Sequence, residues 1–261
     1  MTNRIRGWFR VCLCTSLSFS ACTFGTPESI CSSNAECQDA FGWGRVCSGD
    51  GLCEYAVPEP RCDKTIPSDL LINPDLYRDR IVLGATMERV DSVQELKGME
   101  LAINQVNDNG GLEGRLFAMI QCDNVEDQNI DARTATEAVG DIGKYLGDRI
   151  GAPVIVGAGT SGNTAALYQA IETLGTLIIS PSATSPSLTD LDGLSHSDEQ
   201  PGRLWRTAPP DSIQGTVIAL DMIARNIEDV AVIYEQGPYG EGLAEAFAEN
   251  FAGDGRAYTF Y

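Results

Sequence analysis

Two short segments of this chain concentrate hydroxyl side chains immediately after apolar runs that have the character of buried strands. Thr160 and Ser161 belong to the first segment, and residues 182–184, Ser-Ala-Thr, form the second. At the start of a helix, hydroxyl groups and free backbone N–H groups bind a carboxylate or another anion without any lysine or arginine. The same residues also serve as ordinary helix caps and turn formers, so their types alone leave both roles open.

The first segment lies inside a glycine-rich turn, Gly157 to Gly162, that fits the pattern G-x-G-x-x-G. In a dinucleotide-binding fold this turn is followed about 20 residues later by an acidic residue that binds the ribose. Here the corresponding stretch, residues 179–182, reads Ile-Ser-Pro-Ser. The turn therefore favours tight packing between a strand and a helix, and we expect no cofactor.

Few residues of the chain have the chemistry of a catalytic group. His196 is the one histidine of the sequence and belongs to a polar loop, where such a side chain is usually solvated. The sequence has no Gly-x-Ser-x-Gly elbow and no histidine or carboxylate cluster with metal-ligand spacing. The acidic residues between Asp123 and Asp131 are interpreted as a solvated face. We therefore expect no catalytic residue and no metal ion, in a protein that is not an enzyme.

The overall charge excludes several classes of partner. The 261 residues include 37 acidic and 18 basic side chains, which gives a formal net charge of −19. Nucleic-acid binding requires a basic surface that displaces counterions, so DNA and RNA are not expected partners. An anionic lipid surface is disfavoured for the same reason. The charge is typical of a protein that is soluble outside the cytoplasm.

The N-terminus has the order of an export signal. Arg4, Arg6 and Arg10 precede an uncharged run, residues 11–20, which ends at the small residue Ala21. This arrangement is typical of a secretory signal peptide, and the apolar run is too short to span a bilayer, which takes about 20 residues. We therefore expect an exported protein with a signal peptide at residues 1–21.

The end of this signal, Phe19-Ser-Ala-Cys22, resembles that of bacterial lipoproteins, in which the cysteine is lipidated. The resemblance implies lipidation of Cys22, and so a protein held at a membrane, on its periplasmic or cell-surface face, only through the N-terminal lipid. An ordinary cleaved signal peptide is the alternative. The cysteine count favours lipidation, because removing Cys12 and Cys14 with the signal and lipidating Cys22 leaves six of the nine cysteines, a number that can pair completely.

Those six cysteines indicate disulfides in an oxidising compartment. No Cys-x-x-Cys pair occurs, so zinc is not expected. Four of them predict a small knot of two disulfides whose pairing the spacing leaves open: Cys31, Cys37, Cys47 and Cys53. Cys62 and Cys122 then form a candidate third bridge between a linker and the region that follows.

Downstream of the knot, apolar strand-like runs alternate with amphipathic helical segments. Strands are expected at residues 81–85, 116–122, 154–156, 177–179, 204–207, 230–234 and 257–261, and helices at residues 92–109, 130–146, 162–174, 212–224 and 241–251. The first helix is expected to begin with a capping box formed by Ser92 and Glu95. This alternation predicts an α/β fold with doubly wound parallel sheets. Ligands of such sheets bind beyond the carboxyl ends of the strands.

Three motifs in order carry a resemblance to a known family. Residues 179–189 read ISPSATSPSLT, residues 206–215 read RTAPPDSIQG, and residues 239–244 read YGEGLA. With the helix and turn at residues 98–111, they resemble the type I periplasmic binding proteins, specifically the group that binds branched-chain amino acids. The resemblance covers residues 81–261 and implies two α/β lobes that close on a ligand in the cleft between them.

The resemblance also implies roles for individual residues. The hydroxyl segments would hold the carboxylate and amino group of an amino acid or amide, and one aromatic residue would cover the ligand from the second lobe. These ligand-binding residues are Ser161, Thr160, Ser182, Ala183, Thr184 and Tyr239. The hinge between the lobes would be Thr207, Ala208, Pro209 and Pro210. The loop at residues 87–93 is shorter than in the family and lacks the aromatic residue that lines the side-chain pocket, which leaves the ligand open.

These observations predict four segments: a signal peptide (1–21), a lipid anchor with knot and linker (22–66), a first α/β lobe (67–209) and the start of a second, incomplete lobe (210–261). The family's second lobe is longer, so a truncated chain is expected. By resemblance, the function would be that of the solute-binding component of an ABC-type transporter, with a membrane permease as partner. The alternative is a ligand-sensing receptor module of the same fold that signals to a protein partner.

Overall fold

The computed structural model describes residues 31–193, 197–253 and 255–261. The expected signal peptide, the lipidation site Cys22 and the loop residue His196 lie outside these residues. In the part of the chain that is described, no helix combines the length and apolar character that a membrane crossing requires.

A six-stranded sheet forms the centre of the first unit, which we define as residues 64–206. Its strand order is β3-β5-β4-β6-β7-β8. The strands are β3 (Lys64–Ile66), β4 (Ile81–Met87), β5 (Phe117–Asp123), β6 (Val154–Gly157), β7 (Leu177–Ser180) and β8 (Leu204–Arg206). Strands β4 to β8 run parallel, as predicted, and β3 joins β5 antiparallel at the edge. The linker residues 64–66 therefore belong to the sheet.

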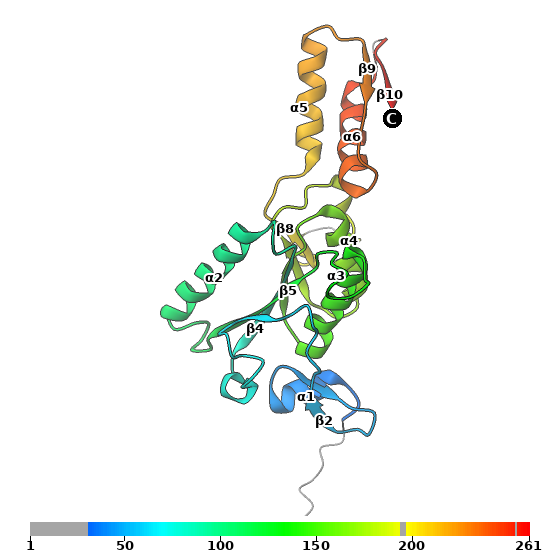
Figure 1. The fold of residues 1–261 in the computed structure, drawn as a ribbon. Helices are drawn as coiled ribbons and strands as arrows, with labels where there is room; N and C mark the ends of the chain where they lie inside the picture. The colour runs from blue at the N-terminus through cyan, green and yellow to red at the C-terminus, as the bar shows by residue number, and fades with distance from the viewer. Residues whose placement is uncertain (1–30, 194–196, 254) are drawn as a thin grey trace, which may run out of the picture.

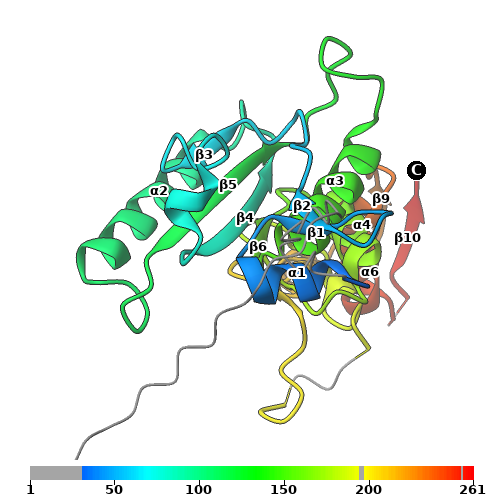
Figure 2. The ribbon, with the colours of Figure 1, turned by 90° about the horizontal axis from the view of Figure 1, so that it is seen from below.

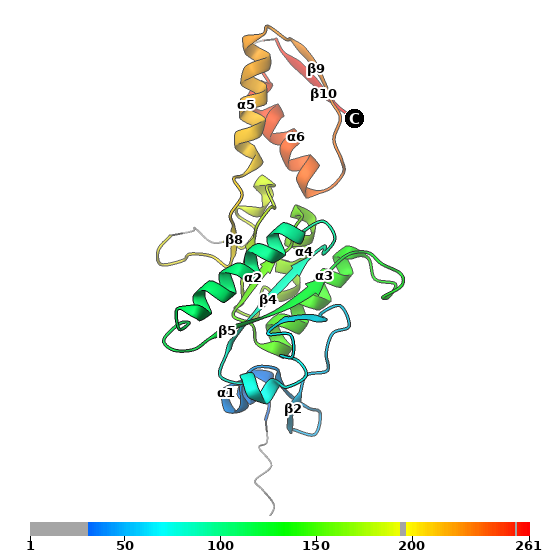
Figure 3. The ribbon, with the colours of Figure 1, turned by 60° about the vertical axis from the view of Figure 1, so that its left-hand side comes forward.

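Helices cover both faces of this sheet. Helix α2 (Val93–Asp108) lies across one face, where Ile103 packs on Ala85 and Met119 (Figure 3). The helices α3 (Ala135–Lys144) and α4 (Ser161–Ile171) lie together on the other face, and a π-helical turn, η2 (Tyr145–Ile150), continues α3. Most of the buried apolar side chains lie on the α3 and α4 side, so this layer holds the main core.

Helix α3, rather than α2, carries the capping box. The prediction at Ser92 is wrong, because that side chain makes no cap hydrogen bond. Thr134 accepts a hydrogen bond from the backbone N–H of Glu137, whose carboxylate accepts one in return from the Thr134 backbone N–H at 2.9 Å. Both sites fit the same sequence pattern, and the surroundings decide which of them forms the box.

The knot, residues 31–55, consists of α1 (Asn34–Phe41) and a hairpin of β1 (Arg45–Cys47) and β2 (Cys53–Tyr55). Its disulfides join Cys31 to Cys47 and Cys37 to Cys53. The knot docks on η2 at one end of the first unit, as Figure 2 shows from below; there the Gln38 amide donates to the Asp148 carbonyl at 2.7 Å. A short 3₁₀ turn, η1 (Pro74–Tyr77), lies beside it, because the Trp43 indole donates to the Tyr77 carbonyl at 2.9 Å.

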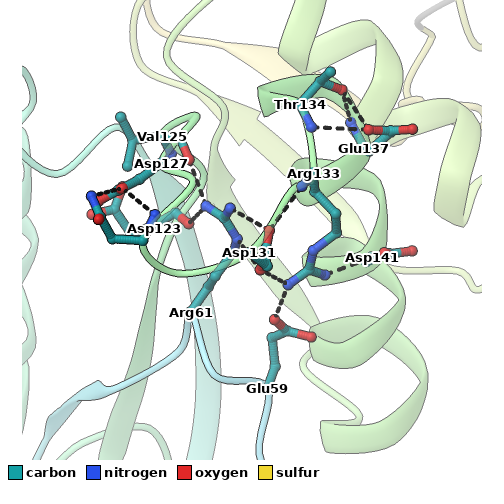
Figure 4. A network of polar contacts seen from close by, with 11 residues as sticks. Glu59, Arg61, Asp123, Val125, Asp127, Asp131, Arg133, Thr134, Glu137 and Asp141 are labelled. Carbon is teal, nitrogen blue, oxygen red and sulfur yellow. Dashed lines mark hydrogen bonds and ion pairs between the residues drawn. The ribbon is translucent and has the colours of Figure 1, made fainter.

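The expected third disulfide, Cys62–Cys122, is confirmed. It ties the linker to β5 at a point where the linker is also held by a buried arginine. Arg61 is only 1% exposed and donates from Nε and Nη2 to the two carboxylate oxygens of Asp131, at 2.9 and 2.7 Å (Figure 4). Arg133 donates to the same carboxylate at 2.7 Å and to Glu59 at 2.6 Å.

The interpretation of the acidic residues 123–131 as a solvated face is therefore wrong for Asp123 and Asp131, whereas Glu126 is exposed as predicted. Asp131 is the counter-ion of a buried cation, and its hydrogen bonds to Arg61 and Arg133 hold its pKa well below the usual range of an aspartate. Asp123 is also buried and accepts hydrogen bonds from the backbone N–H groups of Arg89 and Val125, at 3.2 and 3.1 Å. The acidic run fastens the linker and two loops to the carboxyl edge of the sheet.

The second unit, residues 211–261, stands beyond that edge (Figure 1). It contains α5 (Asp211–Ala224), β9 (Asp229–Val232), α6 (Pro238–Phe251) and β10 (Ala257–Phe260), with β9 and β10 paired in parallel. Ala219, Phe247 and Phe251 form its core. The helices approach closely at Gly215, where a Cβ atom would lie 2.7 Å from the backbone of α6.

Candidate ligand-binding cleft

A cleft of about 550 Å³ lies between the two units. On the first unit it is bordered by the turn before α4 and by the segment after β7, at the carboxyl ends of neighbouring parallel strands. On the second unit it is bordered by the starts of α5 and α6. The lining residues are Gly159, Thr160, Ser161, Gly162, Ser182, Thr184, Asp211, Gln214 and residues 235–240.

The N-terminus of α4 supplies the hydrogen-bond donors of the cleft. Thr160 is the N-cap, and its hydroxyl accepts the Asn163 backbone N–H at 3.2 Å. Ser161 is 2% exposed, and its hydroxyl accepts the Ser185 backbone N–H at 3.1 Å. Within the described residues the Ser161 hydroxyl has no acceptor of its own, so its proton is available to a ligand. The first backbone N–H groups of a helix have no partner inside that helix and suit an anion.

The segment after β7 faces the same space. Ser182 donates from its hydroxyl to the Gly159 carbonyl at 2.7 Å, which ties the two hydroxyl segments together. Thr184 donates from its hydroxyl to the Asp211 carboxylate at 2.7 Å, and the Asp211 N–H donates to the Thr184 carbonyl at 2.8 Å. Ala183 is 1% exposed, its N–H donates to the Ser180 hydroxyl at 3.1 Å, and its side chain belongs to the core.

Tyr239 lies on the opposite wall, in the first turn of α6, with about half of its surface exposed. The turn before it is tight, because a Cβ atom on Gly240 would lie 2.0 Å from the Glu235 carbonyl oxygen. Only glycine therefore allows the loop after β9 to bend back onto α6. The structure thus brings Thr160, Ser161, Ser182, Thr184 and Tyr239 to one cleft, whereas Ala183 lies beneath its floor.

The residues 207–210 link the two units covalently. Thr207 is held on the first unit, because its N–H donates to the Ser180 carbonyl at 3.0 Å and its hydroxyl to the Pro181 carbonyl at 3.1 Å. Pro210 is the N-cap of α5. Two consecutive prolines therefore separate a fixed threonine from the first helix of the second unit.

The ligand-binding residues named from the sequence do not include the polar residues that the second unit contributes, namely Asp211, Gln214, Glu235 and Gln236. The rule that ligands bind beyond the carboxyl ends of strands does point to the loop after β9, which contains Glu235 and Gln236. Asp211 and Gln214 were not predicted at all.

The charged residues that line the cleft, within the described part of the chain, are Asp211 and Glu235, and both are acidic. A third carboxylate, Glu88, lies beside the α4 N-terminus, with the Asn163 amide 3.5 Å from its Oε1. Burial raises the pKa of Glu88, and the negative charges of Asp91 and Asp123 raise it further. The cleft can therefore hold an anionic group only by neutral donors, and it offers carboxylates to a cationic one.

Comparison with known proteins places the chain in a family. The family described as "Receptor family ligand binding region" matches residues 94–256, more than half of the chain. A "Leu/Ile/Val-binding protein homolog 1" of Brucella abortus is 34% identical over 174 residues, which are 66% of this chain and 42% of that protein. A "Leu/Ile/Val-binding protein homolog 3" of Brucella melitensis is 32% identical over 156 residues, 59% of this chain and 38% of that protein.

Solved structures agree with this assignment. The branched-chain amino acid transporter substrate-binding protein LivJ of Streptococcus pneumoniae, in complex with isoleucine, has a TM-score of 0.54 and 25% identity, over 70% of this chain and 49% of that one. An ABC transporter substrate-binding protein of Desulfitobacterium hafniense in complex with Leu has a TM-score of 0.52 and 23% identity, over 69% and 50% of the two chains.

These relatives are named for binding and not for catalysis, and this chain spans about two fifths of the length of the two curated ones. The family match covers α2 to the loop before β10, which includes every element that borders the cleft. The chain belongs to the receptor-family ligand-binding regions and has the fold of the type I periplasmic binding proteins.

Proposed function

We propose that this protein is the extracytoplasmic solute-binding component of an ABC-type transporter and binds an amino acid or a related small molecule between its two units. The ligand carboxylate is held by the α4 N-terminus and the Ser161 hydroxyl. Thr184 and the acidic residues of the cleft are available to the amino group, and Tyr239 covers the ligand from the second unit. The three disulfides support an oxidising compartment outside the cytoplasm, in agreement with the expected export signal.

One observation carries this proposal. The two hydroxyl segments and Tyr239 come from β6–α4, β7–β8 and β9–α6 connections that are far apart in sequence, yet they line one cleft. That cleft lies at the carboxyl ends of adjacent parallel strands, where open α/β sheets bind ligands. A set of neutral donors opposite an aromatic side chain suits the polar end of a zwitterion.

Thermal unfolding of the oxidised protein against a panel of amino acids and small amides tests the proposal. A ligand that binds only the native state raises the melting temperature. At a ligand concentration one hundred times Kd, the free energy of unfolding rises by about 2.7 kcal/mol. Ser161→Ala and Thr184→Ala each remove one hydroxyl from the cleft and should weaken binding about tenfold.

Thr216→Ala is the matched control, because that hydroxyl donates to the Ser212 carbonyl within α5 and does not line the cleft. It should leave the ligand-induced shift unchanged. If a folded, oxidised protein shows no shift with any compound of the panel, the proposed function is wrong.

Ligand sensing is the second candidate function, and the knot is the observation that favours it. The knot adds a disulfide-rich surface to the first unit, with Phe41, Leu52 and Tyr55 more than one third exposed. A sensor would use such a surface to contact a protein partner. Loss of uptake in a strain that lacks the cognate permease, with ligand binding retained, would identify transport.

A further inference from the structure

The cleft has few of the contacts that an aliphatic ligand side chain requires. Among its described lining residues there is no leucine, isoleucine, valine, methionine, phenylalanine or tryptophan. Its apolar surface comes from glycines, Pro238 and Tyr239, and the remaining side chains are hydroxyls, amides and carboxylates. A branched-chain side chain gains binding free energy by leaving water for apolar contact. The two curated relatives are named for such ligands, whereas the described lining of this cleft offers few of these contacts.

The carboxylates around the cleft are more numerous than the cationic side chains available to pair with them. Asp211 is engaged by the Thr184 hydroxyl. Glu235 is exposed on the second unit, and Glu88 lies on the first unit at the other side of the α4 N-terminus. Within the described residues neither glutamate forms an ion pair. The neighbouring Arg89 is taken by Asp63, at 2.6 Å.

A serine hydroxyl without a hydrogen-bond partner lies at the same corner. Ser92 is 8% exposed, and its hydroxyl makes no hydrogen bond within the described residues, although it begins a 16-residue helix. A Cβ atom built on Gly159 would lie 3.7 Å from the Met87 methyl group and 3.9 Å from the Oγ atoms of both Ser92 and Ser182, so one apolar group and two hydroxyls surround the glycine that lines the cleft. The Ser92 backbone N–H donates to the Glu88 carbonyl at 3.0 Å, which places both residues on one turn.

We propose that the ligand of this cleft is an amino acid with a cationic side chain, of the lysine or ornithine type, and that Glu88 recognises its terminal ammonium. This inference rests on the proposed function. In this arrangement the α4 N-terminus holds the carboxylate, Glu235 faces the α-ammonium, and the side chain extends across Gly159 toward Glu88 and Ser92. An ammonium group brings three donors, which match the Glu88 carboxylate and the Ser92 hydroxyl.

The test compares L-lysine with L-norleucine, which has the same chain length without the terminal ammonium. Isothermal titration calorimetry of the full oxidised protein should show that lysine binds at least about tenfold more tightly, as expected for a charge-assisted hydrogen bond. Glu88→Gln preserves the shape of the side chain and should reduce this preference to less than about threefold. Ser92→Ala should reduce it in the same direction.

Glu172→Gln is the control, because this exposed carboxylate lies at the opposite end of α4. It should leave the preference unchanged. Equal or tighter binding of norleucine or leucine by the wild-type protein would overturn the cationic ligand and leave the proposed function intact. A lysine preference that survives in Glu88→Gln would overturn the role of Glu88. Failure of every amino acid and every small amide of the panel to bind would overturn the proposed function itself.

Discussion

Arg61 and Asp131 show how a single pair of residues fixes a long segment of this protein. The guanidinium group is removed from water and is stabilised because Asp131 and the carbonyls of Val125 and Asp123 accept hydrogen bonds from it. Residues 61 and 131 belong to the linker and to the loop before α3, so their ion pair holds the linker on the first unit.

The lowered pKa of Asp131 predicts an acid-labile contribution to stability. The pKa of Asp131 is lower in the folded protein than its unfolded value of 3.8. Ionised Asp131 therefore stabilises the native state fully above pH 3.8, and this stabilisation is lost as the pH falls from 3.8 through the folded-state pKa. Asp131→Asn should therefore unfold in less urea than the wild type at about pH 7. The difference between the two proteins should shrink steadily below about pH 4.

Asp141→Asn provides the comparison for this measurement. Asp141 is half exposed and contacts only the outer side of Arg133, at 3.2 Å, so its removal should change the urea midpoint little. A gap between Asp131→Asn and the wild type that stays constant from about pH 7 to pH 3 would contradict the assignment of the acid-labile contribution to Asp131.

Among the elements, β5 and the linker are joined covalently by a disulfide. We expect its removal to lower the free energy of unfolding strongly. Cys62 and Cys122 are separated by 60 residues, so their bond restricts the unfolded chain strongly. The double variant Cys62→Ala with Cys122→Ala should lower the free energy of unfolding by about 4 kcal/mol. Hydrogen exchange should then show faster exchange throughout the six-stranded sheet.

The knot disulfide Cys31–Cys47 closes only 16 residues and lies within one small element. Its replacement by two alanines should accelerate exchange in α1 and in the β1–β2 hairpin, and leave β4 and β6 protected. Equal loss of protection in the sheet from both double variants would show that the knot and the first unit unfold as one.

Which elements could be predicted depended on whether their signal was local. The strands β4 to β8 and the helices α2, α4, α5 and α6 follow from runs of apolar residues with strand or helix spacing, and the structure has them within a few residues of the predicted bounds. The helix predicted at residues 130–146 begins five residues later, at Ala135, and continues as the π-helical turn η2. The helix α1 and its hairpin have no such run, because two disulfides replace the apolar core there. The Ser92 capping box failed because the pattern is local, whereas the serine hydroxyl lies beside Gly159.

The same limit applies to the cleft. Thr160, Ser161, Ser182, Thr184 and Tyr239 could be named from the sequence, because each is in a motif that resembles a known family. For Glu88 and Glu235 only the loops that contain them could be predicted, at the strand ends where ligands bind. Asp211 was not predicted, since its proximity to the hydroxyl segments depends on how α5 meets the first unit in space. The buried position of Arg61 was unpredictable for the same reason, because its partner lies 70 residues away.

At the scale of the whole molecule, the cleft is formed by two units joined through Thr207, Ala208, Pro209 and Pro210. We expect ligand binding to draw the units together about this link, which X-ray scattering would detect as a smaller radius of gyration in the bound state. Pro209→Gly with Pro210→Gly enlarges the range of open conformations without touching the ligand. It should weaken binding about threefold to tenfold.

Pro153→Gly is the corresponding control, because that proline precedes β6 at the far end of the strand from the cleft. An unchanged radius of gyration on binding, in a protein with a measured ligand affinity, would contradict closure. An unchanged affinity in the double glycine variant would contradict the role of residues 209 and 210.

The position of the knot would decide how the protein stands on a surface if it is tethered through its N-terminal side. The described chain begins at the knot, and the knot lies at the end of the molecule opposite α5 and α6 (Figure 1). A tether at that end would hold the long axis upright, with the first unit below and the second unit above. The cleft lies between the two units, so the first unit would then hold it away from the surface.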